Sequence, residues 1–179
     1  YYKNKYGNKL EFSLSGGKIN AVVHYQFYTG AAAVRTWTVV TNISREPVGL
    51  EYVSSFSYTG LDENGLKIMI PHNSWAREAS WRAYTPWDLS LQKTMATGSK
   101  RIAVSNTGTW SSKEHLPMAA AVSESGALMW QLENNGSWHW EISDVSNMLY
   151  LKISGPTEQE NAWYHELMPG ESFESVRAC

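Results

Sequence analysis

The sequence predicts an all-β fold, a large antiparallel β-sandwich with little helix, and three observations support this class. Short runs of alternating apolar and polar residues recur at intervals of roughly ten residues, with turn-forming residues between them. No segment has the long periodicity of an amphipathic helix. The 179 residues contain no repeat, linker or low-complexity tract, so residues 1–179 are expected to form a single domain.

The N-terminal half contains the clearest strand patterns. Residues 10–14 alternate apolar and polar side chains and run into a pair of glycines, as an antiparallel strand and its turn would. The runs 19–28, 34–40, 48–58 and 66–70 are also extended in character and are bounded by turn residues. Each run is therefore predicted to be one strand.

The middle of the chain is less regular. Residues 72–98 show neither helical nor strand periodicity, so we expect long loops around one or two short strands, and such loops often carry binding residues. Residues 158–167 predict a short helix or a wide loop. Strand patterns resume in six later runs, at residues 101–104, 118–122, 127–133, 137–142, 149–153 and 172–176.

Residues 128–141 combine a turn signal with clustered aromatic side chains. Asn135 and Gly136 separate two alternating runs, and this dipeptide tolerates positive φ at both central positions of a tight turn, so an antiparallel hairpin is predicted. Trp138 and Trp140 share one face of the second strand. The two indoles form either a core ladder between sheets, which we favour, or a strip that stacks on sugar. His139, on the other face, is expected to be structural.

Composition argues against several classes of protein. The formal net charge of -2 does not suit a nucleic-acid-binding surface, which needs clustered Lys and Arg. No apolar run approaches the roughly 20 residues that cross a bilayer. We therefore expect neither a nucleic-acid partner nor a membrane partner. The single cysteine, Cys179, excludes an intramolecular disulfide, which slightly favours a cytoplasmic location.

No residue spacing points to catalysis or to a metal. No pair of carboxylates stands out as the pair that glycoside hydrolases use. The five histidines lack metal-ligand spacing, and the chain has no phosphate-binding glycine loop and no serine nucleophile elbow. We expect no bound metal and no cofactor.

Several short motifs, taken in order along the chain, resemble one enzyme family. They are RTWT at residues 35–38, PVGLE at 47–51, WARE at 75–78, WQLENNGSWHWEI at 130–142, LYL at 149–151, GPTE at 155–158 and PGESF at 169–173. Any one of them alone is a weak signal, but the ordered set spans nearly the whole chain. It is similar to the N-terminal domain of glycoside hydrolase family 36 (GH36), the melibiase-type α-galactosidases.

The resemblance implies a fold for this domain and places the catalytic residues in a different domain. In this family the domain is a large β-sandwich, called a supersandwich, that packs beside a (β/α)8 barrel of the same chain. The barrel carries the two catalytic aspartates of a retaining α-galactosidase. Residues 1–179 stop where that barrel would begin and lack the family's opening strands. We therefore expect part of a longer protein, without hydrolytic activity of its own and with a sandwich that lacks an edge.

The resemblance also indicates Trp75 and Arg77 as substrate-binding candidates. In oligomeric members of the family, loops of this domain approach a substrate site, sometimes that of a neighbouring subunit. An indole stacks on a sugar face, and a guanidinium offers a planar set of donors to hydroxyls. The alternative, which we weight more heavily, is structural: Trp75 would cover the core and Arg77 would pair with Glu78. Trp81 and Trp87 are interpreted as loop anchors rather than as a carbohydrate platform.

Two functions therefore compete. The first is an accessory domain of an α-galactosidase, which contributes to oligomerisation and to the rim of a substrate site. Its expected partners are the catalytic barrel, a second copy of the protein and a galactoside ligand. The second is a stand-alone carbohydrate-binding module whose Trp-rich loops hold a glycan.

Overall fold

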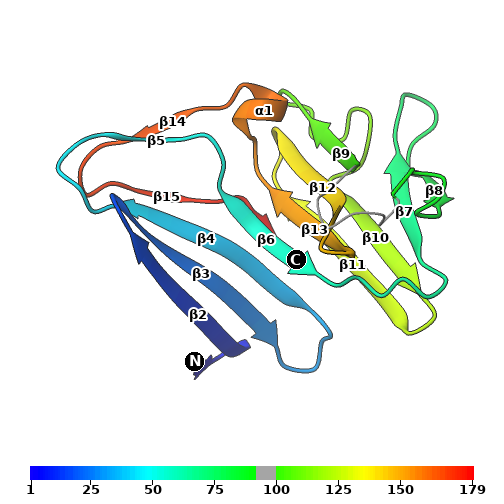
Figure 1. Ribbon diagram of the computed structural model, residues 1–179, viewed down its shortest axis with the longest axis horizontal. Helices are drawn as coiled ribbons and strands as arrows, with labels where there is room; N and C mark the ends of the chain where they lie inside the picture. The colour runs from blue at the N-terminus through cyan, green and yellow to red at the C-terminus, as the bar shows by residue number, and fades with distance from the viewer. Residues whose placement is uncertain (92–99) are drawn as a thin grey trace.

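The protein is built from antiparallel β-sheets with one short helix at their edge (Figure 1). The structure, a computed structural model, describes residues 1–91 and 100–179. Within these residues every strand pairing is antiparallel. The all-β sandwich predicted from the sequence is confirmed.

The strands among the described residues form three sheets. The large, 10-stranded sheet has the order β1 (Tyr2–Asn4), β2 (Gly7–Gly16), β3 (Ile19–Tyr28), β4 (Val34–Asn42), β16 (Arg177–Ala178), β11 (Gly126–Glu133), β10 (Met118–Ser123), β7 (Lys67–His72) and β8 (Ser80–Tyr84), with β15 (Ser172–Glu174) also paired to β4. The 4-stranded sheet has the order β6 (Ser54–Thr59), β13 (Met148–Ser154), β12 (Trp138–Val145) and β9 (Arg101–Asn106). The 2-stranded sheet pairs β14 (His165–Leu167) with β5 (Val48–Leu50).

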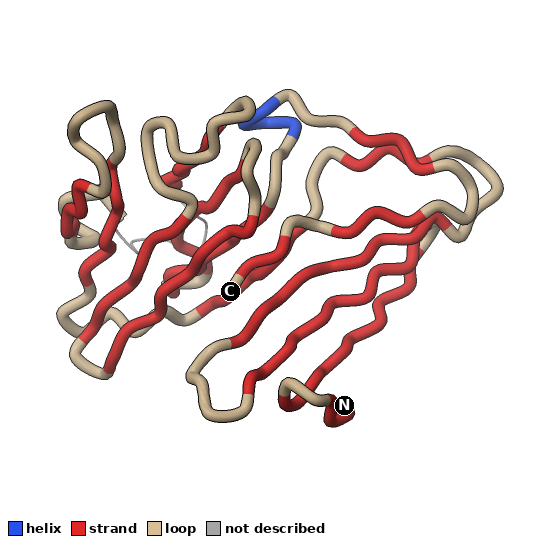
Figure 2. Tube along the Cα trace, turned by 180° about the vertical axis from the view of Figure 1, so that it is seen from behind, coloured by secondary structure: helices blue, strands red, loops and turns tan. Residues whose placement is uncertain are grey.

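The two ends of the large sheet lie at opposite ends of the molecule. Strands β2, β3 and β4 form a long extension on one side, while β7 and β8 lie at the other end (Figure 1). Seen from behind, the helix α1 (Glu158–Asn161) and the β5–β14 pair run along one edge of the molecule (Figure 2). No helix among the described residues has the length and apolar character needed to cross a membrane.

The main core lies between the large sheet and the four-stranded sheet. Trp130 of β11 and Trp140 of β12 meet there from opposite sheets, with ring centroids 5.3 Å apart and ring planes at 78°. Trp138 lies on the same face of β12 as Trp140, and both side chains are 0% exposed. A buried indole removes roughly 150–250 Å² from water, which stabilises the fold by about 4–6 kcal/mol at about 25 cal/mol per Å². These three tryptophans therefore supply a large share of the hydrophobic stabilisation.

The prediction of a hairpin at residues 128–141 is wrong. Strand β11 belongs to the large sheet and β12 to the four-stranded sheet, so the chain crosses between layers at this point. Neither Asn135 nor Gly136 has a positive φ. The inner faces of both strands carry tryptophan, and the crossing lets these faces oppose each other instead of lying side by side in one sheet. Burial of the indoles outweighs the local preference of Asn-Gly for a tight turn.

The tight hairpin of this region lies one strand later. Ser146 and Asn147 have φ values of 50° and 64° and connect β12 to β13, whose pairing ends at Val145 and Met148. Two consecutive residues with positive φ match the two-residue turn that fits the twist of adjacent strands. The turn chemistry expected at Asn135 and Gly136 is therefore found at Ser146 and Asn147.

The predicted strand at residues 48–58 is two strands in two different sheets. Strand β5 pairs with β14, and β6 pairs with β13. Leu50 and Val53 are both buried in a second, smaller core with Val40 and Leu167. Residues three apart cannot point to the same side of one regular strand, so the chain turns between them. The runs predicted at 19–28, 34–40 and 66–70 are confirmed as β3, β4 and β7.

The C-terminal segments complete the large sheet. The run predicted at 172–176 contains β15 and ends before β16, and both of these strands pair with β4. Ala178 of β16 pairs with Thr36 on one side and Leu132 on the other, so β16 joins the two halves of the sheet. Residues 158–167, predicted as a helix or a loop, contain α1, whose first turn is capped by Thr157, and then β14.

Candidate functional site

Trp75 and Arg77 lie on the loop of residues 73–79, which joins β7 to β8 at one end of the large sheet. Trp75 is 87% exposed, so it does not cover the core. Arg77 is also exposed, and its backbone N–H donates to the carbonyl of Ser74 at 3.0 Å. Glu78 accepts a hydrogen bond from the backbone N–H of Ala76 at 3.0 Å. The loop therefore presents an indole and a guanidinium to solvent from a hydrogen-bonded turn.

The base of this loop is held by Asn73. Its backbone N–H donates to the carbonyl of Glu114 at 2.8 Å, and its side-chain amide donates to the carbonyl of Ser112. Its side-chain oxygen accepts from the N–H of Ala79 at 2.9 Å, which closes the loop on itself. The backbone and side chain of Asn73 thus link the Trp75 loop to the neighbouring loop of residues 107–116.

That neighbouring loop is fixed in turn to the core by Trp138. The indole Nε1 of Trp138 donates to the carbonyl of Ser111 at 2.7 Å, and the backbone N–H of Gly108 donates to the hydroxyl of Ser137 at 3.0 Å. The position of Trp75 therefore depends on a chain of contacts that begins at a buried residue of β12.

A pair of histidines lies at the same end of the sheet. The rings of His72 and His115 are 4.9 Å apart, and His72 Nε2 is 2.9 Å from the hydroxyl of Tyr84. Burial lowers the pKa of His115, and the neighbouring His72 lowers it further. Among the described residues, no group of three or more His, Cys, Asp or Glu side chains is arranged to hold a metal ion.

The other tryptophans divide into two groups. Trp81 of β8 is 40% exposed and Trp87 is 76% exposed, so the interpretation of Trp87 as a loop anchor is wrong. Trp138 and Trp140 are fully buried, which confirms the core ladder and excludes a sugar-stacking strip on β12. Trp87 is exposed because it follows β8 in a turn rather than standing on the inner face of a paired strand.

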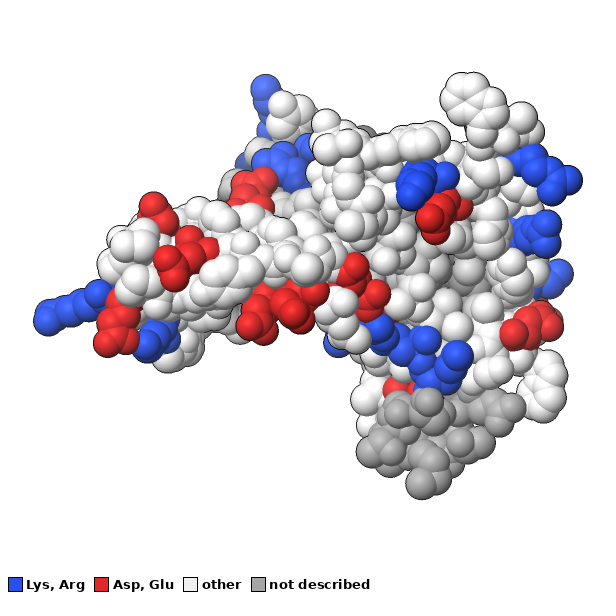
Figure 3. All heavy atoms as spheres, turned by 90° about the horizontal axis from the view of Figure 1, so that it is seen from above, with Lys and Arg blue, Asp and Glu red and all other residues white. Residues whose placement is uncertain are grey.

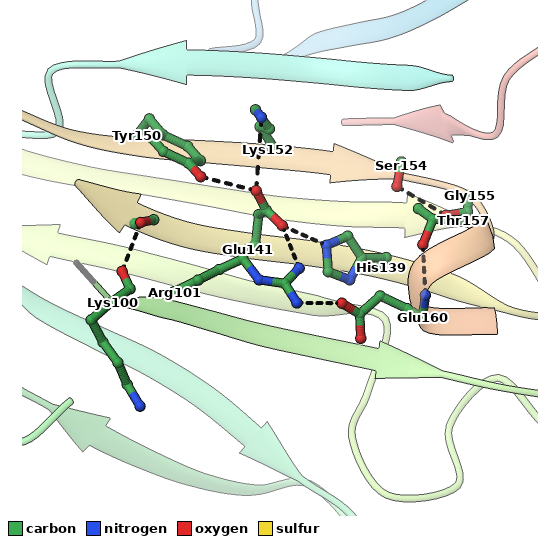
Figure 4. A network of polar contacts seen from close by, with 11 residues as sticks. Lys100, Arg101, His139, Glu141, Tyr150, Lys152, Ser154, Gly155, Thr157 and Glu160 are labelled. Atoms are coloured by element: carbon green, nitrogen blue, oxygen red, sulfur yellow. Dashed lines mark hydrogen bonds and ion pairs between the residues drawn. The ribbon is translucent and has the colours of Figure 1, made fainter. Parts of the chain in front are cut away.

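A second candidate site, which the sequence did not indicate, is a polar network around Glu141 on the outer face of β12 (Figure 4). One carboxylate oxygen lies 3.0 Å from His139 Nε2 and accepts from Arg101 at 2.8 Å. The other accepts from the hydroxyl of Tyr150 at 3.1 Å and lies 3.8 Å from Lys152 Nζ. The carboxylate is thus surrounded by donors from β9, β12 and β13.

The network perturbs the acidity of its central group. The pKa of Glu141 falls from 4.5 to about 2, mainly because of the hydrogen bond from His139, with further contributions from Arg101 and Tyr150. Burial raises the pKa of Tyr150, and the negative charge of Glu141 raises it further. Because an ionised carboxylate only accepts, His139 carries its proton on Nε2. Its Nδ1 has no hydrogen-bond partner among the described residues.

Arg101 extends the network to the helix. Its second guanidinium nitrogen donates to Glu160 of α1 at 2.5 Å, so the guanidinium bridges the four-stranded sheet and α1. A cavity of about 330 Å³ lies beside this bridge, and its walls come from the segment before β6, from β9, β12 and β13, and from α1. They are Glu51, Tyr52, Arg101, His139, Glu141, Lys152, Thr157, Glu158, Gln159 and Glu160.

Sequence reasoning missed this network because its members are far apart in the chain. Glu141 and Arg101 are 40 residues apart, and their contact follows from the pairing of β9 with β12. The alternation of His139 and Glu141 opposite Trp138 and Trp140 was the one available signal. It showed that the two polar residues share a face, but it did not indicate their partners.

Comparisons with known proteins agree on the fold. The sequence matches no family model, and no curated protein matches it. Among solved structures, the chain is similar to the GH36 α-galactosidase AgaB of Geobacillus stearothermophilus (TM-score 0.80, 16% identity) and to AgaA of the same organism (TM-score 0.76, 19% identity); each match covers 95% of this chain and 23% of the enzyme. The chain is also similar to an α-galactosidase from Lactobacillus brevis (TM-score 0.74, 13% identity), and this match covers 97% of this chain and 26% of the enzyme.

This chain therefore spans about a quarter of the length of those enzymes. The match extends over nearly all of residues 1–179. The chain has the β-sandwich fold that GH36 α-galactosidases contain as one part of a much longer polypeptide.

Proposed function

We propose that this chain is an accessory domain of an α-galactosidase, which packs beside a (β/α)8 catalytic barrel of the same polypeptide. The observation that carries the proposal is the coverage of the structural match, 95% of this chain against 23% of each Geobacillus enzyme. In this proposal the complete protein hydrolyses terminal α-galactosides with retention, and the barrel supplies the catalytic carboxylates. Residues 1–179 form one domain that supports the barrel.

The loop of residues 73–79 supplies a second role, at the rim of the substrate site. Trp75 is exposed enough to stack on a sugar ring, and the Arg77 guanidinium offers several donors to hydroxyl groups. The anchor at Asn73 supports this role because a fixed loop loses less conformational freedom on binding than a free one. The galactoside at this rim belongs to the barrel of the same chain or of a neighbouring subunit in a homo-oligomer.

The first test compares residues 1–179 with the complete gene product in the hydrolysis of an aryl α-galactoside. We expect turnover by the complete protein and none by residues 1–179 alone. An inactive complete protein, or turnover by residues 1–179, contradicts the proposal. Light scattering of the complete protein in solution then gives the number of subunits.

The second test addresses the rim. In the complete protein, Trp75→Ala and Arg77→Ala are each expected to raise KM for raffinose about tenfold, because each removes one contact worth about 1.4 kcal/mol. Tyr6→Ala and Arg45→Ala are matched controls, since both residues are exposed and lie toward the opposite end of the large sheet. An unchanged KM in both test variants removes Trp75 and Arg77 from the rim.

A stand-alone carbohydrate-binding module is the second candidate, and the exposed tryptophans favour it. Trp75, Trp87 and Trp110 are 87%, 76% and 52% exposed, which is unusual for so apolar a side chain. Titration of residues 1–179 with galactose and raffinose separates the two functions. A saturable change in tryptophan fluorescence, lost in Trp75→Ala, supports the module, and no change supports the accessory domain.

A further inference from the structure

We propose that the cavity beside α1 is a binding site for a neutral, monosaccharide-sized sugar. The cavity is separate from the loop of residues 73–79, and this inference does not rest on the function proposed for that loop. It rests on the size of the cavity, on the mixture of charges in its walls and on the way its polar groups are held.

The size of the cavity fits a single sugar ring. Its volume of about 330 Å³ lies at the lower end of the range of about 300–1,000 Å³ found for small-molecule sites. Its walls come from different parts of the chain: the segment before β6, three strands of the four-stranded sheet, and α1. The backbone N–H of Glu158 donates to the carbonyl of Glu51 at 2.8 Å, so the helical wall and the wall that carries Tyr52 are joined.

The charges in the walls favour a neutral ligand. Arg101 and Lys152 contribute positive charge, and four glutamates contribute negative charge, namely Glu51, Glu141, Glu158 and Glu160. An anionic ligand would meet four carboxylates at short range, which is unfavourable in a partly enclosed site. Acidic and basic residues also lie near one another on the face of the molecule seen in Figure 3. Hydroxyl groups both donate and accept, so a sugar can use both kinds of wall.

The polar groups of the floor are held in place before any ligand arrives. Glu141 receives hydrogen bonds from three side chains, and Arg101 is fixed between Glu141 and Glu160 (Figure 4). The side chain of Glu141 is only 11% exposed. Groups that are already ordered lose little further freedom on binding, so weak contacts to hydroxyls can give measurable affinity.

Tyr52 provides the apolar side of the site. It is 43% exposed and lines the cavity, so its ring can pack against the C–H face of a pyranose. Gln159 is exposed on the wall formed by α1, and its amide can both donate and accept. An aromatic ring together with an amide and carboxylates in one cavity can serve both the C–H face and the hydroxyl groups of a sugar ring.

The test is an NMR titration of ¹⁵N-labelled residues 1–179 with methyl α-galactoside and methyl α-glucoside. We expect saturable shifts in the amides of Tyr52, Lys152 and Gln159. Tyr52→Ala should weaken binding about tenfold, since it removes a stacking contact of about 1.4 kcal/mol. Tyr58→Ala is the matched control, because Tyr58 is exposed to the same extent (44%) but lies outside the cavity walls.

Gln159→Ala gives a second variant in case the first alters the fold, and the amide spectrum of each variant reports its fold directly. Galacturonate should bind more weakly than the neutral sugars, because the walls carry more carboxylates than cations. The inference is overturned if neither sugar shifts these amides, if the shifts are confined to residues 73–79, if Tyr52→Ala and Gln159→Ala both bind normally, or if galacturonate binds most tightly. Shifts at residues 73–79 alone would leave the rim role intact, so the two proposals fail separately.

Discussion

Tryptophan is buried in the core of the molecule but exposed at the end of the large sheet that carries β7 and β8. Trp130, Trp138 and Trp140 are at most 2% exposed, whereas Trp75 and Trp87 are 87% and 76% exposed. The core group lies on the inner faces of β11 and β12, which are paired on both sides and covered by the facing sheet. The exposed group lies in loops and turns. Whether a tryptophan lies on the inner face of a paired strand therefore decides whether its side chain is buried in the core or exposed to solvent.

The largest expected effect separates the two groups by stability. Trp140→Ala should lower the free energy of unfolding by about 3–5 kcal/mol, because it leaves a large cavity against Trp130. Trp87→Ala should change it by less than about 0.5 kcal/mol. Urea unfolding of both variants measures the difference. Equal destabilisation by the two substitutions would mean that the exposed group also supports the fold.

The next effect concerns the outer face of the same strand. The pKa of Glu141 is lowered in the folded protein, so its contribution to stability is complete above its ordinary pKa of 4.5 and is lost as the pH falls toward about 2. The shift corresponds to about 3 kcal/mol at roughly 1.4 kcal/mol per unit. Urea unfolding between these pH values should show a steeper loss of stability in the native protein than in Glu141→Gln. The exposed Glu114→Gln is the control and should keep the native pH profile.

A smaller effect is expected at the base of the Trp75 loop. Asn73→Ala removes the side-chain hydrogen bonds to Ser112 and Ala79, which should lower stability by about 1–2 kcal/mol. Hydrogen exchange of the amides of residues 74–79 should accelerate more than that of the core strands. Asn64→Ala, at an exposed turn, should leave both measurements unchanged. Protection that persists in Asn73→Ala would mean that the loop is held by other contacts.

The smallest expected effect on stability is at Trp75 itself. Trp75→Ala should change the free energy of unfolding by less than about 0.5 kcal/mol, because the side chain makes little contact with the core. Thermal unfolding followed by circular dichroism measures it. A loss above about 1 kcal/mol would restore the structural interpretation of this residue and weaken its assignment to a substrate rim.

Local patterns predicted the individual strands better than their partners. Strand β4 follows from alternation that is visible within its run, because that alternation reflects one buried and one less buried face. Strand β3 follows from a run rich in Val, Tyr and Phe, the residue types that favour strands. The layer change between β11 and β12 depends on where Trp130 meets Trp140, which no short segment reveals. Trp75 and Arg77 could be proposed as candidates because they lie within one short motif. The Glu141 network could not, since its partners come together only through the register of β9, β12 and β13.

Strand β16 joins the two halves of the large sheet, and this affects the order in which parts of the protein can fold. Thr38 and Ser175 are hydrogen-bonded although they are 137 residues apart, and β16 pairs with both β4 and β11. A ribosome releases β4 long before it makes residues 172–178, so until then the edges of β4 and β11 lack these partners. Closing so long a stretch of chain is slow and entropically costly. The two halves of the sheet are therefore expected to remain separate until residues 172–178 have been made, and to be joined only then.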